Sequence, residues 1–577
     1  MIHLSLFGII GGVVLTTLGL IMGFVVFPPV IDMKVKESVQ LLEDSDQYYR
    51  WEALPQALDF KVYFFNVTNV DEIQNGGKPR VAEVGPYIYS QYRRKHNVQF
   101  SDDKTTITYT QTQKYYFNAE ASAPRKQNDK IILLNMVMNT VFQTLESQIK
   151  DTLVDIRSGV NNTLESIPLV SVVKRIIERT TPLQEHIRNN FDRSKIGGRL
   201  RDFQSILQRA ETESTANLGF INGELNRVFN RPDSMFVKTT PKEFLFDGIP
   251  FCIKPVIGIA AIICKQIADA KSNTVTQFDD GSLKFALFNY KNNSHDGVFI
   301  VNTGYRDPLK TGKIEFWNGH SSLKNWLNNP GGSTSICNMI NGTDASSFPP
   351  FRKRDEDLFI FSSDICRSVK LVYYKEGEYR NIPSFQYRTL FLNQIGQEYG
   401  NECFCINQIP KAIVQKNGCL FRGALDLTSC LNANIIATNP HFLGASPEYT
   451  SLIDGFEPDF RKHQILIDVE PHTGIPLRGG KRIQFNMFLR KVDSISLTKN
   501  LKTTLFPVVW IDEGIELNDE MVNLVNKSLI NVLFYLDLVQ WGSVVIGCLL
   551  GVSCTVWFLI KKKKLRSQSV EPIFMIK

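Results

Sequence analysis

Residues 541–564 read WGSVVIGCLLGVSCTVWFLIKKKK. The part from Trp541 to Ile560 has no charged side chain, and its length is about the 20 residues that an α-helix needs to cross a bilayer core. The lysines that follow, Lys561–Lys564, should stay in the cytoplasm under the positive-inside rule. This stretch therefore predicts a transmembrane helix followed by a basic cytoplasmic tail, residues 561–577.

A second uncharged apolar run, residues 4–27, lies near the other end of the chain. Two spans place residues 28–540 on one side of the membrane, and a cytoplasmic tail makes that side extracellular. Residues 1–3 would then form a short cytoplasmic N-terminus. A cleaved signal peptide is the alternative, but residues 1–3 hold no Lys or Arg and the run exceeds the roughly 7–15 apolar residues of a signal core. We expect an uncleaved anchor.

The formal net charge of +7 comes largely from the tail, where six Lys or Arg face only Glu571. The extracellular region is therefore almost neutral and gives no reason to expect a nucleic-acid partner. We interpret the tail lysines as a stop-transfer signal rather than as a site for anionic lipid. The tail ends in Phe574–Lys577 without a clear dileucine sorting signal, which favours the plasma membrane over the lysosome.

Two of the ten cysteines, Cys548 and Cys554, lie in the second span, and the other eight lie between the spans. An even number of extracellular cysteines indicates disulfides. A zinc site is the alternative, but the spacing of Cys403 and Cys405 does not fit a zinc finger and no His lies nearby. Eight cysteines allow roughly a hundred pairings, so counting leaves the connectivity open.

Glycosylation sequons also fall between the spans, where N-linked glycans are added. The predicted acceptors are Asn66, Asn161, Asn292, Asn341 and Asn526.

The extracellular region has three compositional zones. Residues 57–117 alternate apolar and polar side chains between turn signals, which predicts strands. From about residue 133 to 231 the period changes to four, as in Val141, Leu145, Ile149 and Leu153, which predicts a cap of amphipathic helices. Aromatic and β-branched runs then return. The pattern predicts a single α+β domain, rich in strands, with one helical insertion.

The chain lacks the common signatures of hydrolases, nucleotide-binding proteins and metalloproteases. Asp468 and Glu470 are spaced like paired acid and base groups, and His441, His463 and His472 lie close in sequence. We interpret the carboxylates as exposed or hydrogen-bonded and the histidines as structural. The sequence therefore predicts a protein that is not an enzyme and that uses no cofactor and no metal.

Many short stretches, in order along almost the whole chain, resemble the class B scavenger receptors of the fatty-acid translocase type. They are Phe27–Pro29, Asp59–Asn69, Glu83–Tyr87, Met339–Asp344, Phe361–Ser368, Cys403–Cys405, Pro440–Phe442, Ala445–Pro447, Asp454–Gly455 and Asp468–Pro471. Within this family, Phe246–Cys252 with Cys264, and Trp510–Gly514, are similar to the insect sensory neuron membrane proteins. An insect lipid-uptake or phagocytic receptor is the close alternative.

The resemblance implies an antiparallel β-barrel core, an apical helical bundle away from the membrane and an internal apolar tunnel. It also implies four disulfides. These would join Cys337 to Cys403, Cys366 to Cys430, Cys405 to Cys419 and Cys252 to Cys264. The helical zone departs from the family, because it is about twice as long as the resemblance leads us to expect.

The function that this resemblance implies is a cell-surface lipid receptor. It would take fatty-acid-derived ligands, such as pheromone or odorant lipids, from carrier proteins and deliver them to the membrane or to a neighbouring odorant receptor channel. Basic cap residues are candidate ligand contacts, although a solvated outer face is the alternative: Lys174, Arg175, Arg179, Lys195, Arg199 and Arg201. The alternative function is a scavenger or adhesion receptor for lipoproteins, apoptotic cells or microbes.

Overall fold

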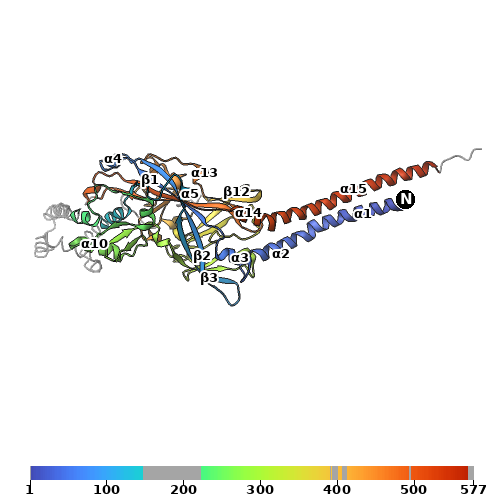
Figure 1. The fold of residues 1–577 in the computed structure, drawn as a ribbon, viewed down its shortest axis with the longest axis horizontal. Coiled ribbons are helices and arrows are strands. Elements are labelled where there is room, and N and C mark those ends of the chain that lie inside the picture. The colour runs from blue at the N-terminus through green and yellow to red at the C-terminus, as the bar shows by residue number, and fades with distance from the viewer. Residues whose placement is uncertain are drawn as a thin grey trace, which may run out of the picture.

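The computed structural model describes residues 2–146, 222–389, 392, 400–405, 412–492 and 495–568. In the described part, a large mixed domain carries two long helices that leave it at the same end (Figure 1). This arrangement agrees with the predicted α+β class and with the two predicted apolar helices at the ends of the chain.

The N-terminal helix is built from α1 (Ile2–Ile21), a π-helical turn (Met22–Val26) and α2 (Phe27–Val39). The C-terminal helix consists of α14 (Asp519–Val525), a second π-helical turn (Asn526–Ile530) and α15 (Asn531–Gln568). The continuous helices that contain the apolar spans cover 35 and 48 residues, and at 1.5 Å per residue both are longer than the ~30 Å of a bilayer core.

Both helices thus continue past the apolar spans toward the large domain. Pro28 and Pro29 do not end the N-terminal helix. They occupy the first turn of α2, directly after the π-helical turn, where a missing N–H costs little. Outward side chains such as Phe7, Leu549 and Val552 are exposed. So much exposed apolar surface is expected where lipid covers it.

The large domain is organised around one antiparallel sheet (Figure 1). Its main path is β10 (Ile314–Trp317), β9 (Ser294–Asn302), β3 (Thr106–Phe117), β2 (Val81–Phe100), β1 (Leu58–Val67), β18 (Thr504–Glu516), β17 (Pro476–Leu489), β16 (Leu466–Val469), β13 (Ile382–Arg388), β12 (Arg367–Tyr379) and β11 (Leu358–Ser362). The short strands β15 (Ile436–Thr438) and β14 (Ala424–Asp426) extend from β17. In chain order, the first strand is β1 and the last is β18, and these two strands are neighbours in the sheet.

The two edge strands, β10 and β11, are bridged by the backbone at Gly342 and Thr343. The Ile314 amide donates to the Gly342 carbonyl over 2.9 Å, and the Phe361 amide donates to the Thr343 carbonyl over 2.9 Å. Gly342 has a φ of 86°, and a Cβ there would lie 1.9 Å from the Phe359 carbonyl oxygen. The sheet is therefore nearly closed, as the predicted barrel requires.

The interior of the sheet is filled by alternate side chains of its strands. Phe60, Val62 and Phe64 on β1 are all at most 2% exposed. The Phe60 ring lies 5.0 Å from that of Tyr115 and 5.4 Å from that of Phe288. Edge-to-face contacts of this kind add to the stabilisation from burial.

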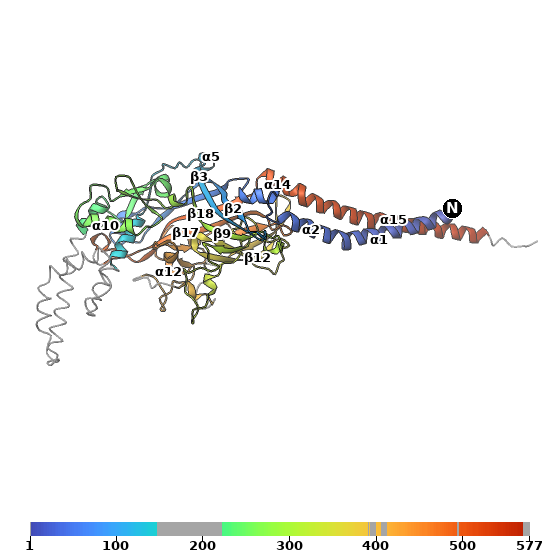
Figure 2. The ribbon, with the colours of Figure 1, turned by 90° about the horizontal axis from the view of Figure 1, so that it is seen from below.

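Smaller elements gather at the end opposite the terminal helices (Figure 2). Two small sheets pair β4 (Ile131–Leu134) with β5 (Phe236–Thr239), and β6 (Ile249–Phe251) and β7 (Val275–Gln277) with β8 (Leu283–Phe285). They are accompanied by α10 (Gly258–Asp269) and by helical residues 136–146 and 222–228. The rest of the predicted helical cap lies outside the described residues.

Short helices connect the strands elsewhere. They are α3 (Asp46–Glu52), α4 (Val70–Gln74), α5 (Ala119–Ser122), α11 (Thr428–Leu431), α12 (Pro447–Thr450) and α13 (Phe460–His463).

Candidate functional site

A cavity of about 40 Å³ lies inside the nearly closed sheet, against β1, β17 and β18. One part of its wall is apolar and is formed by Phe60, Ile483, Phe485 and Ile511, which are all at most 6% exposed. Residues two apart on a strand share a face, so the alternation along β17 and β18 places these side chains inside. The volume holds a few water molecules or a small head group, not a whole acyl chain.

The other part of the wall is charged. Lys481 and Glu513 are cross-strand partners on β17 and β18, and their Nζ and Oε2 atoms lie 2.6 Å apart. Lys481 and Lys291 both contact Asp364, and Arg93 contacts Glu513. We call the charged set the interior ion cluster: Arg93, Lys291, Asp296, Asp364, Lys481 and Glu513.

The neighbours in the cluster decide its charge state. Burial raises the pKa of Glu513, but Arg93 and Lys481 outweigh burial and hold this pKa well below its usual range. Burial also lowers the pKa of Lys291, and Asp296 opposes that shift. Arg93 shows the reverse balance, because Glu513 raises its pKa against the effect of burial. Buried charges persist only when they are paired in this way.

Neutral polar groups extend the ion cluster along β2 and β3. Gln91 donates to Glu513 Oε1 over 2.8 Å and to Gln113 Oε1 over 2.7 Å. The Tyr115 hydroxyl donates to Gln113 Oε1 over 3.0 Å. Each of these side chains is at most 9% exposed. The polar wall is therefore one connected network rather than a set of separate pairs.

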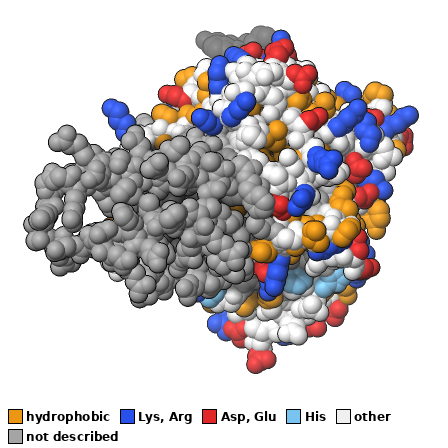
Figure 3. Space-filling view, turned by 90° about the vertical axis from the view of Figure 1, so that its left-hand side faces the viewer, with side chains coloured by type: hydrophobic (Ala, Val, Ile, Leu, Met, Phe, Trp, Pro, Cys, Tyr) orange, Lys and Arg blue, Asp and Glu red, His pale blue; other side chains and the backbone are white. Residues whose placement is uncertain are grey.

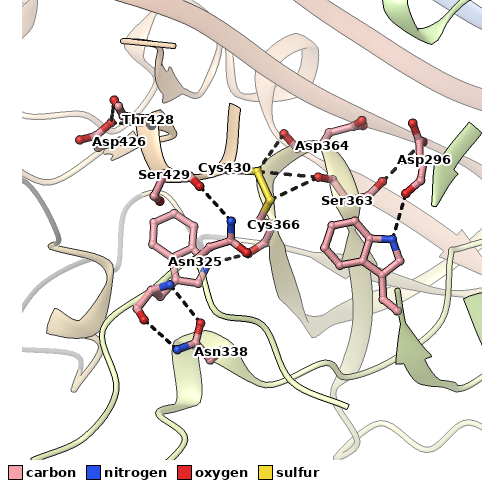
Figure 4. The surroundings of a disulfide bond; sticks show 12 residues. Asp296, Asn325, Asn338, Ser363, Asp364, Cys366, Asp426, Thr428, Ser429 and Cys430 are labelled. Carbon is pink, nitrogen blue, oxygen red and sulfur yellow. Dashed lines mark hydrogen bonds between the residues drawn. A yellow bond between two sulfur atoms is a disulfide. The ribbon is translucent and has the colours of Figure 1, made fainter. Parts of the chain in front are cut away.

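A disulfide fixes the turn that carries Asp364 (Figure 4). Cys366 and Cys430 are joined, with their Cα atoms 5.7 Å apart, and Cys430 Sγ contacts the carbonyl oxygens of Ser363 and Asp364. Ser363 Oγ donates to Asp296 Oδ2 over 3.5 Å. The turn is thus held on both sides, which limits the movement of Asp364 within the cluster.

The structure joins the remaining cysteines into three more disulfides. The pairs are Cys337–Cys403, Cys405–Cys419 and Cys252–Cys264. Together with Cys366–Cys430, these are the four pairings that the family resemblance implies. All eight lie in the large domain, and the two cysteines of the second span are unpaired in the described part of the chain.

Residues 10–558 match the sequence model of the CD36 family. The chain belongs to this family. Sensory neuron membrane protein 2 of Anopheles gambiae is 51% identical over 97% of this chain and 94% of that protein, and its Drosophila melanogaster counterpart is 44% identical over 99% and 100%. Sensory neuron membrane protein 1 of Apis mellifera is 29% identical over 98% of this chain and 93% of that protein.

The histidines that the sequence singled out fall into two places in this CD36-family fold. His441 and His463 stack with their ring centroids 4.5 Å apart, and Glu83 joins them. Glu83 Oε2 lies 2.6 Å from His441 Nε2 and accepts from Trp510 Nε1 over 2.6 Å. Glu83 comes from β2, far away in sequence, and the one sequence feature that includes it is the Glu83–Tyr87 family stretch.

Three ligand-type groups in one place raise the question of a metal ion. The backbone amides of Glu457 and Asp459 donate to the Nδ1 atoms of His441 and His463. Each neutral ring therefore carries its proton on Nε2, and this proton on His441 faces Glu83. A metal bound at Nε2 would need the opposite tautomer. The hydrogen bonds fit a structural Glu–His–His–Trp contact, in line with our interpretation of the histidines.

The acidic pair and the third histidine are held in separate networks. Asp468 accepts from Gln386 over 3.1 Å and contacts Arg478. Glu470 accepts from His472 Nδ1 over 2.8 Å and from Thr473 Oγ1 over 2.6 Å. Both carboxylates are at most 2% exposed. Glu470 also accepts from the backbone amides of His472 and Thr473. Both carboxylates are therefore hydrogen-bonded, which is one of the two alternatives in the sequence analysis.

The predicted glycan acceptors differ in their surroundings. Asn292 is exposed between β3 and β9, whereas Asn66, Asn341 and Asn526 are partly buried. Asn526 begins the π-helical turn before α15, close to the membrane end of the domain. Asn161 lies outside the described residues. Glycosylation of all five remains a prediction.

The end of the domain opposite the membrane helices carries interspersed Lys, Arg, Asp, Glu and hydrophobic side chains (Figure 3). Ile253, Ile257 and Phe278 are among its exposed apolar residues, at 47%, 72% and 40%. The six basic cap residues predicted as ligand contacts, Lys174 to Arg201, lie outside the described residues, and their role remains a prediction.

Proposed function

We propose that this CD36-family protein is a cell-surface lipid receptor that captures fatty-acid-derived ligands, pheromone or odorant lipids among them. It passes them through its interior to the bilayer or to a neighbouring odorant receptor channel. The observation that carries this proposal is a cavity, apolar on one side, inside a nearly closed sheet whose domain is joined to two helices with apolar spans. Such an interior shelters CH₂ groups, each of which costs about 0.8 kcal/mol to expose to water.

The sensory assignment is supported by the relatives, which are named sensory neuron membrane proteins and come from insects. In this proposal the protein resides in the plasma membrane with both termini in the cytoplasm and a glycosylated domain outside. It receives ligand from a carrier protein and changes no covalent bond, so it needs no cofactor. Because the cavity is small, side chains around it must move apart when a long acyl chain passes.

The test uses the full-length protein reconstituted in liposomes. A fluorescent long-chain ester is supplied on a carrier protein, and its rate of arrival in the bilayer is followed. The wild-type protein should accelerate transfer over protein-free liposomes. Ile483→Trp, which fills the cavity, should remove most of that acceleration.

The matched control is Ile436→Trp. Ile436 is also about 1% exposed, but it packs in a separate small core with Phe442 and Tyr449. Both substitutions overpack a core and cost about 1–3 kcal/mol, so a general loss of stability affects them alike. Equal transfer by both variants and the wild type would contradict the conduit. Binding of lipoprotein particles without any transfer would favour the scavenger or adhesion receptor.

A further inference from the structure

The polarity of the cavity changes along two neighbouring strands. Phe485, Ile483 and Lys481 follow one another on the inner face of β17, and Ile511 is followed by Glu513 on β18. After β18 the chain passes directly into α14 and α15. The charged end of the cavity is therefore the end nearer the membrane helices. A ligand that travels toward the bilayer meets the interior ion cluster after the apolar wall.

The cluster is balanced in charge. Three cations, Arg93, Lys291 and Lys481, lie with three carboxylates, Asp296, Asp364 and Glu513. The adjacent pair of Lys95 and Asp344, with Nζ and Oδ2 3.4 Å apart, is balanced as well. An added carboxylate would thus be a buried charge without a counter-ion, which is costly.

Hydrogen-bond donors nevertheless remain for a neutral ligand. An ammonium group has three N–H donors. Among the described residues, Lys481 directs two of them at Asp364 and Glu513, and Lys291 directs one at Asp364. A carbonyl or hydroxyl oxygen accepts such a hydrogen bond without bringing a net charge into the interior. The apolar wall of Phe60, Ile483 and Ile511 is in place for the alkyl part.

We propose that the interior ion cluster is a head-group filter: it admits amphiphiles with an uncharged oxygen-bearing head, such as an ester, aldehyde or alcohol, and rejects ionised carboxylates. The filter deepens the proposed function and rests on it, because it acts only if acyl chains enter the cavity. The Cys366–Cys430 disulfide and the hydrogen bonds around Ser363 keep Asp364 in place, so the cluster cannot easily rearrange around an extra negative charge.

The test compares three ligands with the same chain length: methyl hexadecanoate, hexadecan-1-ol and hexadecanoate. Each competes at pH 7.5 with a fluorescent long-chain ester for the full-length protein in detergent micelles, at concentrations below ligand aggregation. At this pH a carboxylic acid in water is ionised. We expect the wild type to bind hexadecanoate at least about tenfold more weakly than the ester and the alcohol.

Removing one negative charge should reverse the discrimination. Glu513→Gln keeps the shape of the side chain but leaves the cluster with one excess cation. The ratio of hexadecanoate affinity to ester affinity should then rise about tenfold over the ratio measured for the wild type. Asp364→Asn makes the same change of charge at a less buried position. Its ligand affinities are measured instead if Glu513→Gln does not fold. Glu376→Gln, which removes an exposed partner of Arg354, is the control and should change neither affinity.

The outcomes separate the filter from the function beneath it. Failure of all three ligands and the probe to bind would overturn the proposed lipid receptor and the filter with it. Binding of hexadecanoate as tight as that of the ester in the wild type would overturn the filter alone. The same conclusion would follow if the ratio of acid to ester affinity were unchanged in a folded Glu513→Gln or Asp364→Asn variant.

Discussion

Glu513 illustrates what a single residue contributes in this fold. Its strand, β18, is buried over Thr504–Ile511, and the carboxylate stays ionised only because Arg93 and Lys481 contact it. The sequence alone shows a charged residue at an inward position of an apolar strand. The partners of Glu513 lie about 420 and 32 residues away along the chain, so local sequence patterns do not predict these ion pairs. The sequence analysis named His441 and His463, but for the same reason it did not predict their contact with Glu83.

His463 gives a pH-dependent prediction at this scale. Burial, and then the neighbouring His441, lower the pKa of His463 to about 4. The ordinary value in an unfolded chain is about 6.5. Between these two values the unfolded chain binds a proton that the folded protein does not bind. The stabilising free energy is therefore complete above about pH 6.5 and is lost as the pH falls toward 4.

The substitution His463→Asn removes this titration, while its amide oxygen replaces Nδ1 as acceptor for the Asp459 amide. We expect thermal unfolding in detergent to lose less stability between pH 7 and pH 4.5 in the variant than in the wild type, by on the order of 1–2 kcal/mol after solvent screening. The exposed His320→Asn is the control. An unchanged slope in His463→Asn would show that this ring does not titrate as its surroundings imply.

At the scale of elements, the two terminal helices form a close pair. A Cβ on Gly12 would lie 2.7 Å from the Gly547 carbonyl oxygen, and one on Gly19 would lie 3.0 Å from the Gln540 carbonyl oxygen. In a bilayer the hydrophobic effect does not drive helices together. Small residues let two helices approach closely, and the resulting van der Waals contact stabilises the pair. The hydropathy of the two spans predicts that they cross the membrane, whereas their mutual packing depends on which faces carry glycine.

The substitution Gly12→Leu should separate α1 from α15, because the new side chain meets backbone rather than a movable side chain. A cross-link reports the contact: a Cβ on Gly8 would lie 2.3 Å from Cys554 Sγ, so Gly8→Cys should form a disulfide with Cys554 under mild oxidation. Adding Gly12→Leu should reduce this cross-link several-fold. Gly542→Leu is the control, since a Cβ at Gly542 meets nothing within 4 Å. Efficient cross-linking in the Gly12→Leu variant would contradict the packed pair.

At the scale of the whole molecule, the pairing of β1 with β18 brings the two ends of the large domain together. Each end continues into a terminal helix, so the domain is attached to the membrane by two neighbouring helices rather than by one (Figure 1). Two attachments fix the orientation of the barrel relative to the bilayer. The charged end of the cavity is then always the end that faces the membrane.

The topology yields a prediction for intact cells. Epitope tags at both termini should be inaccessible to antibody until the cells are permeabilised, because the positive-inside rule predicts a cytoplasmic tail for the four lysines. A tag in the exposed Asn318–His320 turn should be accessible without permeabilisation. In the same cells, Asn292→Gln should increase gel mobility by the loss of one glycan. An N-terminal tag that is accessible on intact cells, or that is absent from the mature protein, would contradict the uncleaved anchor.

The sequence by itself determined the features that depend on neighbours along the chain. The two apolar spans, the alternating strands around Phe60 and the placement of the cysteines all follow from local composition and period. The order of short motifs along the chain indicated the protein family. The tertiary structure decided what depends on residues that meet only after folding. These are the closure of the sheet at Gly342, the histidine pair on Glu83, and the cavity that is apolar at Ile483 and charged at Lys481. Burial and charge pairing act through space, so their outcome depends on which strands become neighbours.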